Sequence, residues 1–152
     1  MPKTYLVTGG TGFIGSSLVK RLVSEGNVVK VLDNNSRGNA RRISKVIKEL
    51  EFIEGDIRDP EVILHASKNV DCVCHLAYVN GTEYFYSHPE LVLDIAIRGM
   101  LNVIDACRKN NIGDLVLASS SEVYQSPNKF PTPEEVPLIV PDVTNPRYSY
   151  GG

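Results

Sequence analysis

With 152 residues, the chain is long enough for one ordinary domain with a single hydrophobic core. Its net charge of −2 and its balance of 42% hydrophobic and 22% charged residues are typical of a globular protein and exclude a strongly basic nucleic-acid binder. No apolar run approaches the roughly 20 residues that cross a membrane, and no signal peptide is recognisable, so the sequence predicts a cytoplasmic protein with neither a nucleic-acid nor a membrane partner.

Strand patterns and helix patterns alternate along the chain. Short apolar runs, which predict buried strands, occupy residues 4–7, 28–32, 50–53, 71–76 and 115–118. Helical spacing of apolar residues occupies residues 13–25, 39–48, 60–68 and 87–110. This alternation within one domain predicts an α/β fold with a doubly wound parallel sheet, the Rossmann architecture, and right-handed crossovers.

The last of these helices is the longest. Its start, Ser87-His88-Pro89-Glu90, fits a capping box, and its apolar residues cover more than one stripe between positions 91 and 104. We expect it to bury one face on the sheet and another against a further helix, from this chain or from a second subunit. Prolines between positions 127 and 146 then predict an extended surface loop, and another helix could start at Asn145-Pro146.

Three cysteines, an odd number, argue against a disulfide framework and fit a reducing compartment. Two of them stand in Cys72-Val73-Cys74-His75, which contains the residue types of a metal site. That segment has the pattern of a buried strand, however, and the sequence offers no second pair of ligands. We therefore interpret these side chains as core packing and predict no metal site.

A glycine turn, Thr8-Gly9-Gly10-Thr11-Gly12-Phe13-Ile14-Gly15, stands between the first strand and the first helix. Its glycines allow positive φ and close approach to a pyrophosphate, and the helix that follows offers unpaired N–H groups. Asp33, at the end of the second strand, can accept the hydroxyls of an adenine ribose. Its charge favours NAD over NADP, although Arg37 could accommodate the extra phosphate. A tight turn with a capping aspartate and no ligand is the competing interpretation.

Five stretches resemble the extended short-chain dehydrogenase/reductase family, specifically its NAD-dependent nucleotide-sugar epimerases and dehydratases. They are the glycine turn, Gly55-Asp56-Ile57, His75-Leu76-Ala77, the run from Ser119 to Tyr124, and the run from Asn145 to Gly151. The resemblance implies a set of cofactor-binding residues: Gly9, Gly12, Phe13, Ile14 and Gly15 at the pyrophosphate, Asp33 at the ribose, Asp56 and Ile57 beside the adenine, and Leu76 and Ala77 toward the nicotinamide.

The resemblance also implies that Ser120 and Tyr150 are catalytic. A free tyrosine has a pKa of about 10, and the family's lysine together with the nicotinamide charge would favour its phenolate at neutral pH. Ser120 would hold the reacting oxygen of a nucleotide sugar. The implied reaction removes hydride to give a keto sugar and returns it on the other face, which is 4-epimerisation.

Glu122 leaves this choice of reaction open. An acidic residue here could remove the C5 proton and lead to 4,6-dehydration or decarboxylation, or it could form only a structural hydrogen bond. The chain also departs from the family pattern at three places: Ala96-Ile97-Arg98-Gly99-Met100 stands where Asn-Val-x-Gly-Thr is usual, and Tyr78 and Gln125 replace smaller residues. These departures put the identity of the sugar in question.

The sequence given ends two residues after Tyr150, before the position of the family's lysine. From the resemblance we expect residues 1–152 to be the NAD-binding Rossmann domain of a longer architecture, with the C-terminal substrate portion absent and a homodimer at full length. A truncated NAD-binding module without turnover is the alternative. We also expect the chain alone to be marginally stable or prone to aggregation, because the apolar surface of residues 91–104 would lose its cover.

Overall fold

The computed structural model describes residues 1–149. The chain forms two compact units. The sheet unit consists of residues 1–78 and 94–118, and the loop unit consists of residues 79–93 together with the segment that begins at Ser119. No helix among the described residues is both long enough and apolar enough to cross a bilayer.

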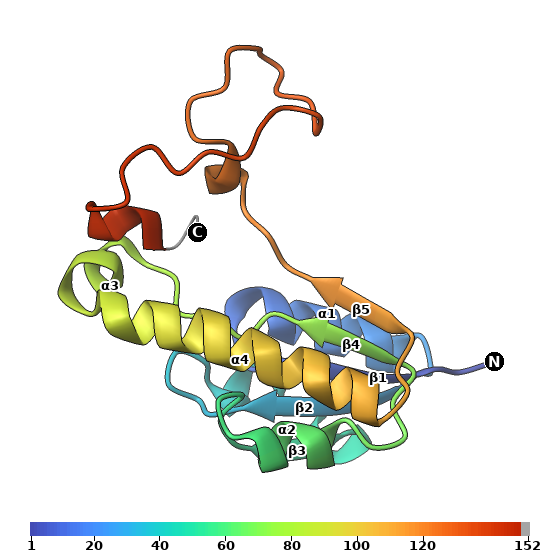
Figure 1. Cartoon of the computed structure of the whole chain (residues 1–152). Coiled ribbons are helices and arrows are strands. Elements are labelled where there is room, and N and C mark those ends of the chain that lie inside the picture. The colour runs from blue at the N-terminus through green and yellow to red at the C-terminus, as the bar shows by residue number, and fades with distance from the viewer. Residues whose placement is uncertain (150–152) are drawn as a thin grey trace. The chain divides into compact units, whose positions relative to one another are not determined.

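The sheet unit is built on five parallel strands, which confirms the predicted doubly wound sheet. Their order across the sheet is β3-β2-β1-β4-β5 (Figure 1). The strands are β1 (Thr4–Thr8), β2 (Val28–Asp33), β3 (Glu51–Glu54), β4 (Cys72–His75) and β5 (Asp114–Leu117). The chain adds β2 and β3 on one side of β1 and then crosses to add β4 and β5 on the other side.

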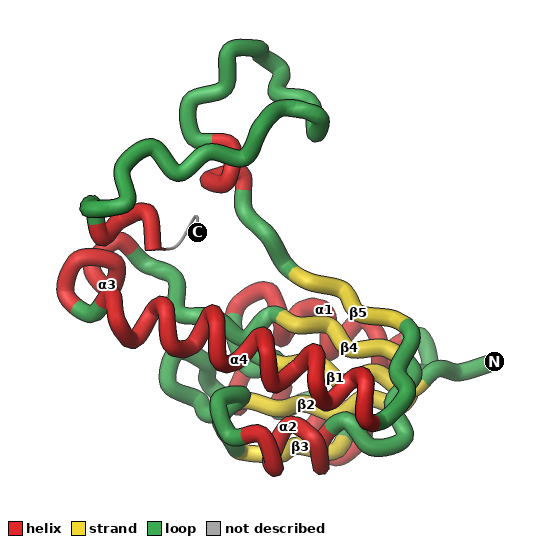
Figure 2. The backbone as a smooth tube through the Cα atoms, viewed as in Figure 1, coloured by secondary structure: helices red, strands yellow, loops and turns green. Residues whose placement is uncertain are grey.

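Helices cover both faces of this sheet. Figure 2 shows α1 (Phe13–Ser24) on one face and α4 (Pro89–Lys109) on the other. The shorter α2 (Pro60–Ala66) begins as predicted, with Pro60 in its first turn and the Asp59 side chain accepting from the backbone N–H groups of Glu61 and Val62. Apolar residues of these helices pack against both faces of the sheet, because a parallel sheet is normally covered on both faces.

The core between α1 and the sheet is made of small branched residues and two cysteines. Val7, Val29 and Val31 of the strands pack with Val19 and Leu22 of α1. The side chains of Cys72 and Cys74 lie in the same cluster, which agrees with the core-packing interpretation. Burial raises the pKa of the Cys74 thiol to about 12, so this thiol stays protonated at neutral pH.

The predicted helix at residues 39–48 is wrong. Two short 3₁₀ turns, η1 (Ala40–Ile43) and η2 (Ile47–Glu49), take its place. The Asn39 side chain accepts from Arg41 N at 2.9 Å and starts the first turn. Ile43 is the buried residue of these turns, so the segment lacks the repeated apolar contacts that hold an α-helix on a sheet.

The predicted capping box at residues 87–90 is also wrong. Ser87 is the last residue of a short helix, α3 (Thr82–Ser87), which the sequence did not reveal. Its hydroxyl donates to the Glu83 carbonyl at 2.7 Å, so it is bonded back into α3 and does not cap the next helix. Pro89, whose missing N–H costs nothing at a helix start, begins α4 instead.

The rest of the loop unit carries little regular structure, as its prolines predicted. Residues 125–145 contain neither helix nor strand. They lie between two 3₁₀ turns, η3 (Ser121–Tyr124) and η4 (Pro146–Ser149). η4 stands where a further helix was expected to start, and it packs against α3 within the same unit. Tyr150 lies outside the described residues.

Two apolar surfaces of the sheet unit are open to solvent. On α4, Ile97 and Leu101 are each 58% exposed, and Ile104 continues the same stripe. All four residues of β5, the edge strand next to β4, are exposed as well. The helix therefore has the second apolar face that its sequence predicted.

Candidate cofactor site

The candidate site begins at the topological switch point of the sheet. At this point β1 and β4 lie side by side, and the connections that follow them lead to opposite sides. Ligands of doubly wound sheets bind outside the carboxyl ends of the strands at such a point. Thr8 ends β1 and His75 ends β4, and these two residues are partners in the parallel register. Because the glycine turn follows Thr8 directly, it starts at the switch point.

The turn is tied to both neighbouring strands. Gly9 N donates to the Leu32 carbonyl of β2 at 2.9 Å, and Gly12 N donates to the Gly9 carbonyl at 3.1 Å. The φ angle of Gly9 is +71°, and a Cβ at this position would lie 2.7 Å from the backbone nitrogen of Ala77. The turn therefore packs directly on the backbone that follows β4. Residues predicted for the pyrophosphate and for the nicotinamide are neighbours.

The start of α1 offers donors of the kind that a phosphate requires. Gly12 is the N-cap residue and has no side chain to accept from the first turn. The N–H groups of Phe13 and Ile14 have no acceptor within residues 1–149. Phe13 and Ile14 are 85% and 70% exposed, so they take no part in the core. A Cβ on Gly12 would contact only the Gly9 carbonyl, which leaves this position open to an approaching anion.

Asp33 ends β2 and is only 8% exposed. Its Oδ2 accepts from Thr11 N at 2.9 Å and its Oδ1 accepts from Asn35 N at 2.8 Å. These bonds fix the glycine turn and the loop after β2. This is the role that Asp33 would have if the turn were purely structural and bound no ligand. Each carboxylate oxygen keeps a second lone pair, so the same side chain can also accept from the hydroxyls of a ribose.

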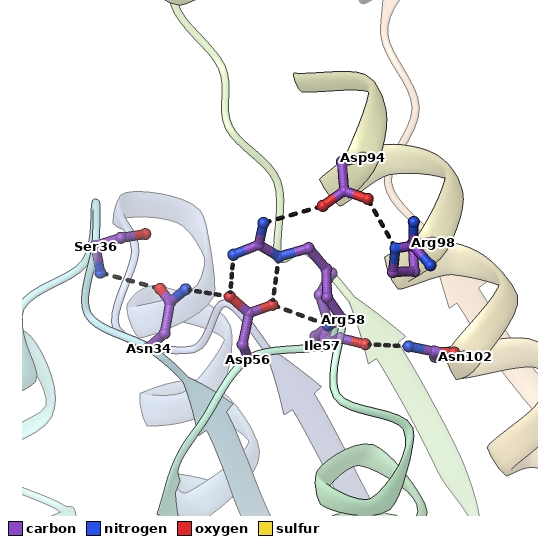
Figure 3. A network of polar contacts seen from close by, with 8 residues as sticks. All are labelled: Asn34, Ser36, Asp56, Ile57, Arg58, Asp94, Arg98 and Asn102. Carbon is purple, nitrogen blue, oxygen red and sulfur yellow. Dashed lines mark hydrogen bonds and ion pairs between the residues drawn. The ribbon is translucent and has the colours of Figure 1, made fainter. Parts of the chain in front are cut away.

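The remaining predicted cofactor residues lie at the ends of the other two strands. Asp56 and Ile57 follow β3, and Leu76 and Ala77 follow β4. Asn34 Nδ2 donates to Asp56 Oδ2 at 3.1 Å and joins the loops after β2 and β3 (Figure 3). The structure thus brings all the predicted cofactor-binding residues to the carboxyl edge formed by β1, β2, β3 and β4.

Sequence reasoning assigned no role in the cofactor site to two buried residues of this edge, Thr8 and His75. Thr8 Oγ1 accepts from the backbone N–H groups of Leu76 and Ala77, both at 3.2 Å. Burial lowers the pKa of His75 to about 4, so its ring is neutral at neutral pH. The signal that could have revealed them is that each of two largely apolar strands ends in a polar residue.

The predicted catalytic residues belong to the loop unit. Ser120 is the N-cap of η3, and its Oγ accepts from Glu122 N at 3.2 Å. The carboxylate of Glu122 is 3.4 Å from Arg147 Nη2. The structure therefore brings Ser120, Glu122 and Arg147 together, of which Arg147 was not predicted. The third predicted catalytic residue, Tyr150, lies outside the described residues.

Comparison with known proteins gives a consistent result. A model of the NAD dependent epimerase/dehydratase family matches residues 5–151. A UDP-glucose 4-epimerase of Neisseria meningitidis serogroup A is 37% identical over 150 residues, which are 95% of this chain and 44% of that protein. The chain spans less than half the length of this relative.

Solved structures of similar proteins share the fold. A UDP-N-acetylglucosamine 4-epimerase of Methanobrevibacter ruminantium, in complex with UDP-N-acetylmuramic acid, matches with a TM-score of 0.86 at 30% identity, over 99% of this chain and 47% of that one. A dTDP-glucose 4,6-dehydratase of Streptomyces venezuelae, with NAD bound, matches with a TM-score of 0.87 at 28% identity, over 98% and 48%.

The sheet order and the position of the glycine turn define a Rossmann-type α/β protein. The family model matches nearly the whole length of the chain. The chain therefore belongs to the NAD dependent epimerase/dehydratase family. The resemblance that the sequence motifs indicated is confirmed.

Proposed function

We propose that the chain binds NAD at the carboxyl edge of β1–β4 and is the cofactor-binding part of a nucleotide-sugar 4-epimerase. The observation that carries the proposal is the pairing of the glycine turn with Asp33. Two backbone N–H groups at the start of α1 lack an acceptor within residues 1–149, and a carboxylate ends the neighbouring strand. A diphosphate fits the first feature and ribose hydroxyls fit the second.

The proposed contacts follow the dinucleotide along this edge. The diphosphate is held by the backbone of the turn and of the first turn of α1: Gly9, Gly12, Phe13, Ile14 and Gly15. Asp33 accepts from the ribose, Asp56 and Ile57 flank the adenine, and Leu76 and Ala77 line the nicotinamide. NAD, when bound, supplies the reversible removal of hydride from a sugar carbon, which is what a 4-epimerase needs in order to invert that carbon.

In this proposal the chain's own catalytic residues handle the proton of the sugar hydroxyl. Tyr150 takes it up, and the Ser120 hydroxyl donates to the oxygen on which charge develops. Because the Ser120 oxygen only accepts in its bond with Glu122 N, its hydrogen is available to donate to the sugar oxygen. The similar 4-epimerases support this choice of reaction, and we infer a nucleotide sugar as the substrate class.

A second candidate reaction is 4,6-dehydration or decarboxylation with Glu122 as the base. Glu122 lies in the same 3₁₀ turn as Ser120, and its carboxylate has an ion pair with Arg147 in the same unit. A carboxylate next to the serine is the kind of group that could remove a C5 proton. The similar 4,6-dehydratase structure supports keeping this candidate.

Two measurements on the purified protein test the proposal. Isothermal titration with NAD tests the cofactor site, and the absence of binding would contradict it. Incubation with UDP-glucose, dTDP-glucose and UDP-glucuronate, followed by NMR of the sugars, separates the reactions. A C4 epimer supports the first candidate, and a 4-keto-6-deoxy sugar or loss of carbon dioxide supports the second. NAD binding without any turnover supports the alternative of an NAD-binding module.

A further inference from the structure

We propose that Arg58 is a positioning residue for adenine recognition. It fixes the carboxylate of Asp56, and helix α4 holds Arg58 in place through Asp94. This inference rests on the proposed function, because it takes the adenine end of NAD as the ligand of Asp56.

The carboxylate of Asp56 is fully engaged (Figure 3). Its Oδ1 accepts from Arg58 N at 2.8 Å and from Arg58 Nε at 3.1 Å. Its Oδ2 accepts from Arg58 Nη2 at 2.8 Å and from Asn34 Nδ2 at 3.1 Å. A carboxylate has about four acceptor positions, and here each oxygen has two donors. Arg58 alone supplies three of the four, so it determines how the carboxylate is oriented.

The same contacts keep Asp56 ionised. The hydrogen bonds from Arg58 hold the pKa of the Asp56 carboxyl below its ordinary value, although partial burial opposes this effect. An ionised acceptor forms stronger hydrogen bonds than a neutral one. Asp56 is therefore suited to accept from an amino group such as the exocyclic amine of adenine.

A ligand amine can bind this carboxylate only by replacing one of the four donors. Two of the three bonds from Arg58 come from its rigid, charged guanidinium group and one comes from its backbone N–H. Each of these bonds keeps the donors of the others in position. Asn34 contributes one neutral amide, on an exposed residue of the loop after β2. We therefore expect the adenine amine to take the place of Asn34 at Oδ2, while Arg58 keeps its contacts.

Helix α4 supports Arg58 from the opposite side. Arg58 Nη1 is 3.0 Å from Asp94 Oδ2, and Arg98 Nε is 2.7 Å from Asp94 Oδ1. The four side chains alternate in charge from Asp56 to Arg98, so each charge lies between or beside opposite ones (Figure 3). The side chains of Asp56, Arg58 and Asp94 are each about one-third exposed or less, which limits screening by solvent.

A second contact fixes the neighbouring residue to the same helix. Asn102 Nδ2 donates to the Ile57 carbonyl at 3.0 Å, two helical turns beyond Asp94. Gly99 lies between these points, where the Ile57 side chain leaves no room for a Cβ. Residues 56–58 are thus attached to α4 at two points, and the adenine end of the site cannot shift without moving this helix.

The test compares NAD with nicotinamide hypoxanthine dinucleotide, in which a carbonyl oxygen replaces the adenine amine. Calorimetry should show that the native protein binds NAD at least about tenfold more tightly, because the carbonyl would face the Asp56 carboxylate. Arg58→Lys keeps the positive charge but lacks the planar guanidinium group that contacts both carboxylate oxygens. In this variant the ratio of the two dissociation constants should fall to about threefold or less. Asp94→Asn should lower it by a smaller factor, since the Asp56–Arg58 pair remains.

Arg21→Lys is the matched control, because Arg21 also forms an ion pair through Nε, at 2.6 Å to Glu25, at the far end of α1. This variant should keep the native preference. A merely structural role of Arg58 would lower the affinity for both dinucleotides equally and leave their ratio unchanged. Should Arg58→Lys fail to fold, Asp94→Asn gives the same comparison with the Asp56 pair intact.

The possible failures are distinguishable. If the native protein binds neither dinucleotide, the proposed function itself is wrong. If it binds NAD but shows no preference over the hypoxanthine analogue, or if Arg58→Lys and Asp94→Asn keep the full preference, NAD binding stands and the role of Arg58 is wrong.

Discussion

The hydroxyl oxygen of Thr8 lies 2.7 Å from Nδ1 of His75, and both side chains are buried at the switch point of the sheet. Thr8 Oγ1 already accepts from two backbone N–H groups, so its hydrogen is donated to the imidazole. Nδ1 is therefore the acceptor, and the neutral ring carries its proton on Nε2. This bond connects the end of β1, where the glycine turn starts, with the end of β4.

The buried neutral ring makes stability depend on pH. Burial lowers the pKa of His75 to about 4 in the folded protein, against 6.5 in the unfolded chain. Between these values the unfolded chain binds more protons, so acid favours unfolding. The stabilisation should be complete above about pH 6.5, decrease by about 3 kcal/mol as the pH falls to 4, and level off below that. Urea unfolding at a series of pH values measures it.

Two variants assign this slope to one residue. His75→Asn should be less stable at neutral pH but should lose most of the dependence between pH 6.5 and 4. His65→Gln, which changes an exposed histidine of α2, should keep the dependence of the native chain. An unchanged slope in His75→Asn would show that His75 is not the group responsible.

Removing the Thr8 hydroxyl should be costly although little volume changes. In Thr8→Val, His75 Nδ1 and the backbone N–H of Ala77 lose their bond, whereas the Leu76 N–H keeps its bond to the Thr8 carbonyl at 3.1 Å. Buried polar groups without a partner cost about 1–3 kcal/mol each, so we expect a loss of at least about 2 kcal/mol in the free energy of unfolding. Thr8→Ser keeps the hydroxyl and should lose less. A Thr8→Val variant as stable as the native chain would contradict this role of the hydroxyl.

The exposed stripe of α4 should drive self-association of the isolated chain. Ile97, Leu101 and Ile104 form a continuous apolar surface on the solvent side of the helix, and surfaces of this kind favour contact between molecules. Ile97→Gln combined with Leu101→Gln should reduce the apparent mass in light scattering at equal concentration. Lys109→Gln, an exposed change at the end of the same helix, is the control. A monodisperse native chain would contradict this prediction.

The sequence predicted the fold well because its signals are local. Each strand contains a short apolar run, and Gly26 and Pro60 mark helix boundaries without help from the rest of the chain. Two local signals were misleading. Residues 39–48 have helical residue types but only one buried position, and Ser87 resembles an N-cap although its hydroxyl is bonded into the preceding turn.

The site was predictable only in part, for a related reason. The glycine turn and Asp33 follow a spacing rule, and their positions agree with it. The bond between Thr8 and His75 joins residues 67 positions apart, and the contact of Arg58 with Asp94 spans 36 positions. Such pairs depend on which strands become neighbours and on how a helix is placed over them, and no single segment of sequence contains that information.

The charge of Asp33 should make the protein prefer NAD to NADP. The carboxylate at the end of β2 would repel a 2′-phosphate on the ribose that it otherwise binds, so we expect at least about tenfold weaker binding of NADP. Asp33→Asn removes the charge but keeps one carbonyl oxygen to accept from Thr11 N or Asn35 N. This variant should bind NAD more weakly and should bring the two dissociation constants, measured by calorimetry, within about threefold. Asp59→Asn, which changes the N-cap carboxylate of α2 to another good capping residue, is the matched control and should keep the native ratio. If Asp33→Asn also keeps that ratio, Asp33 does not face the ribose and serves only to hold the turn.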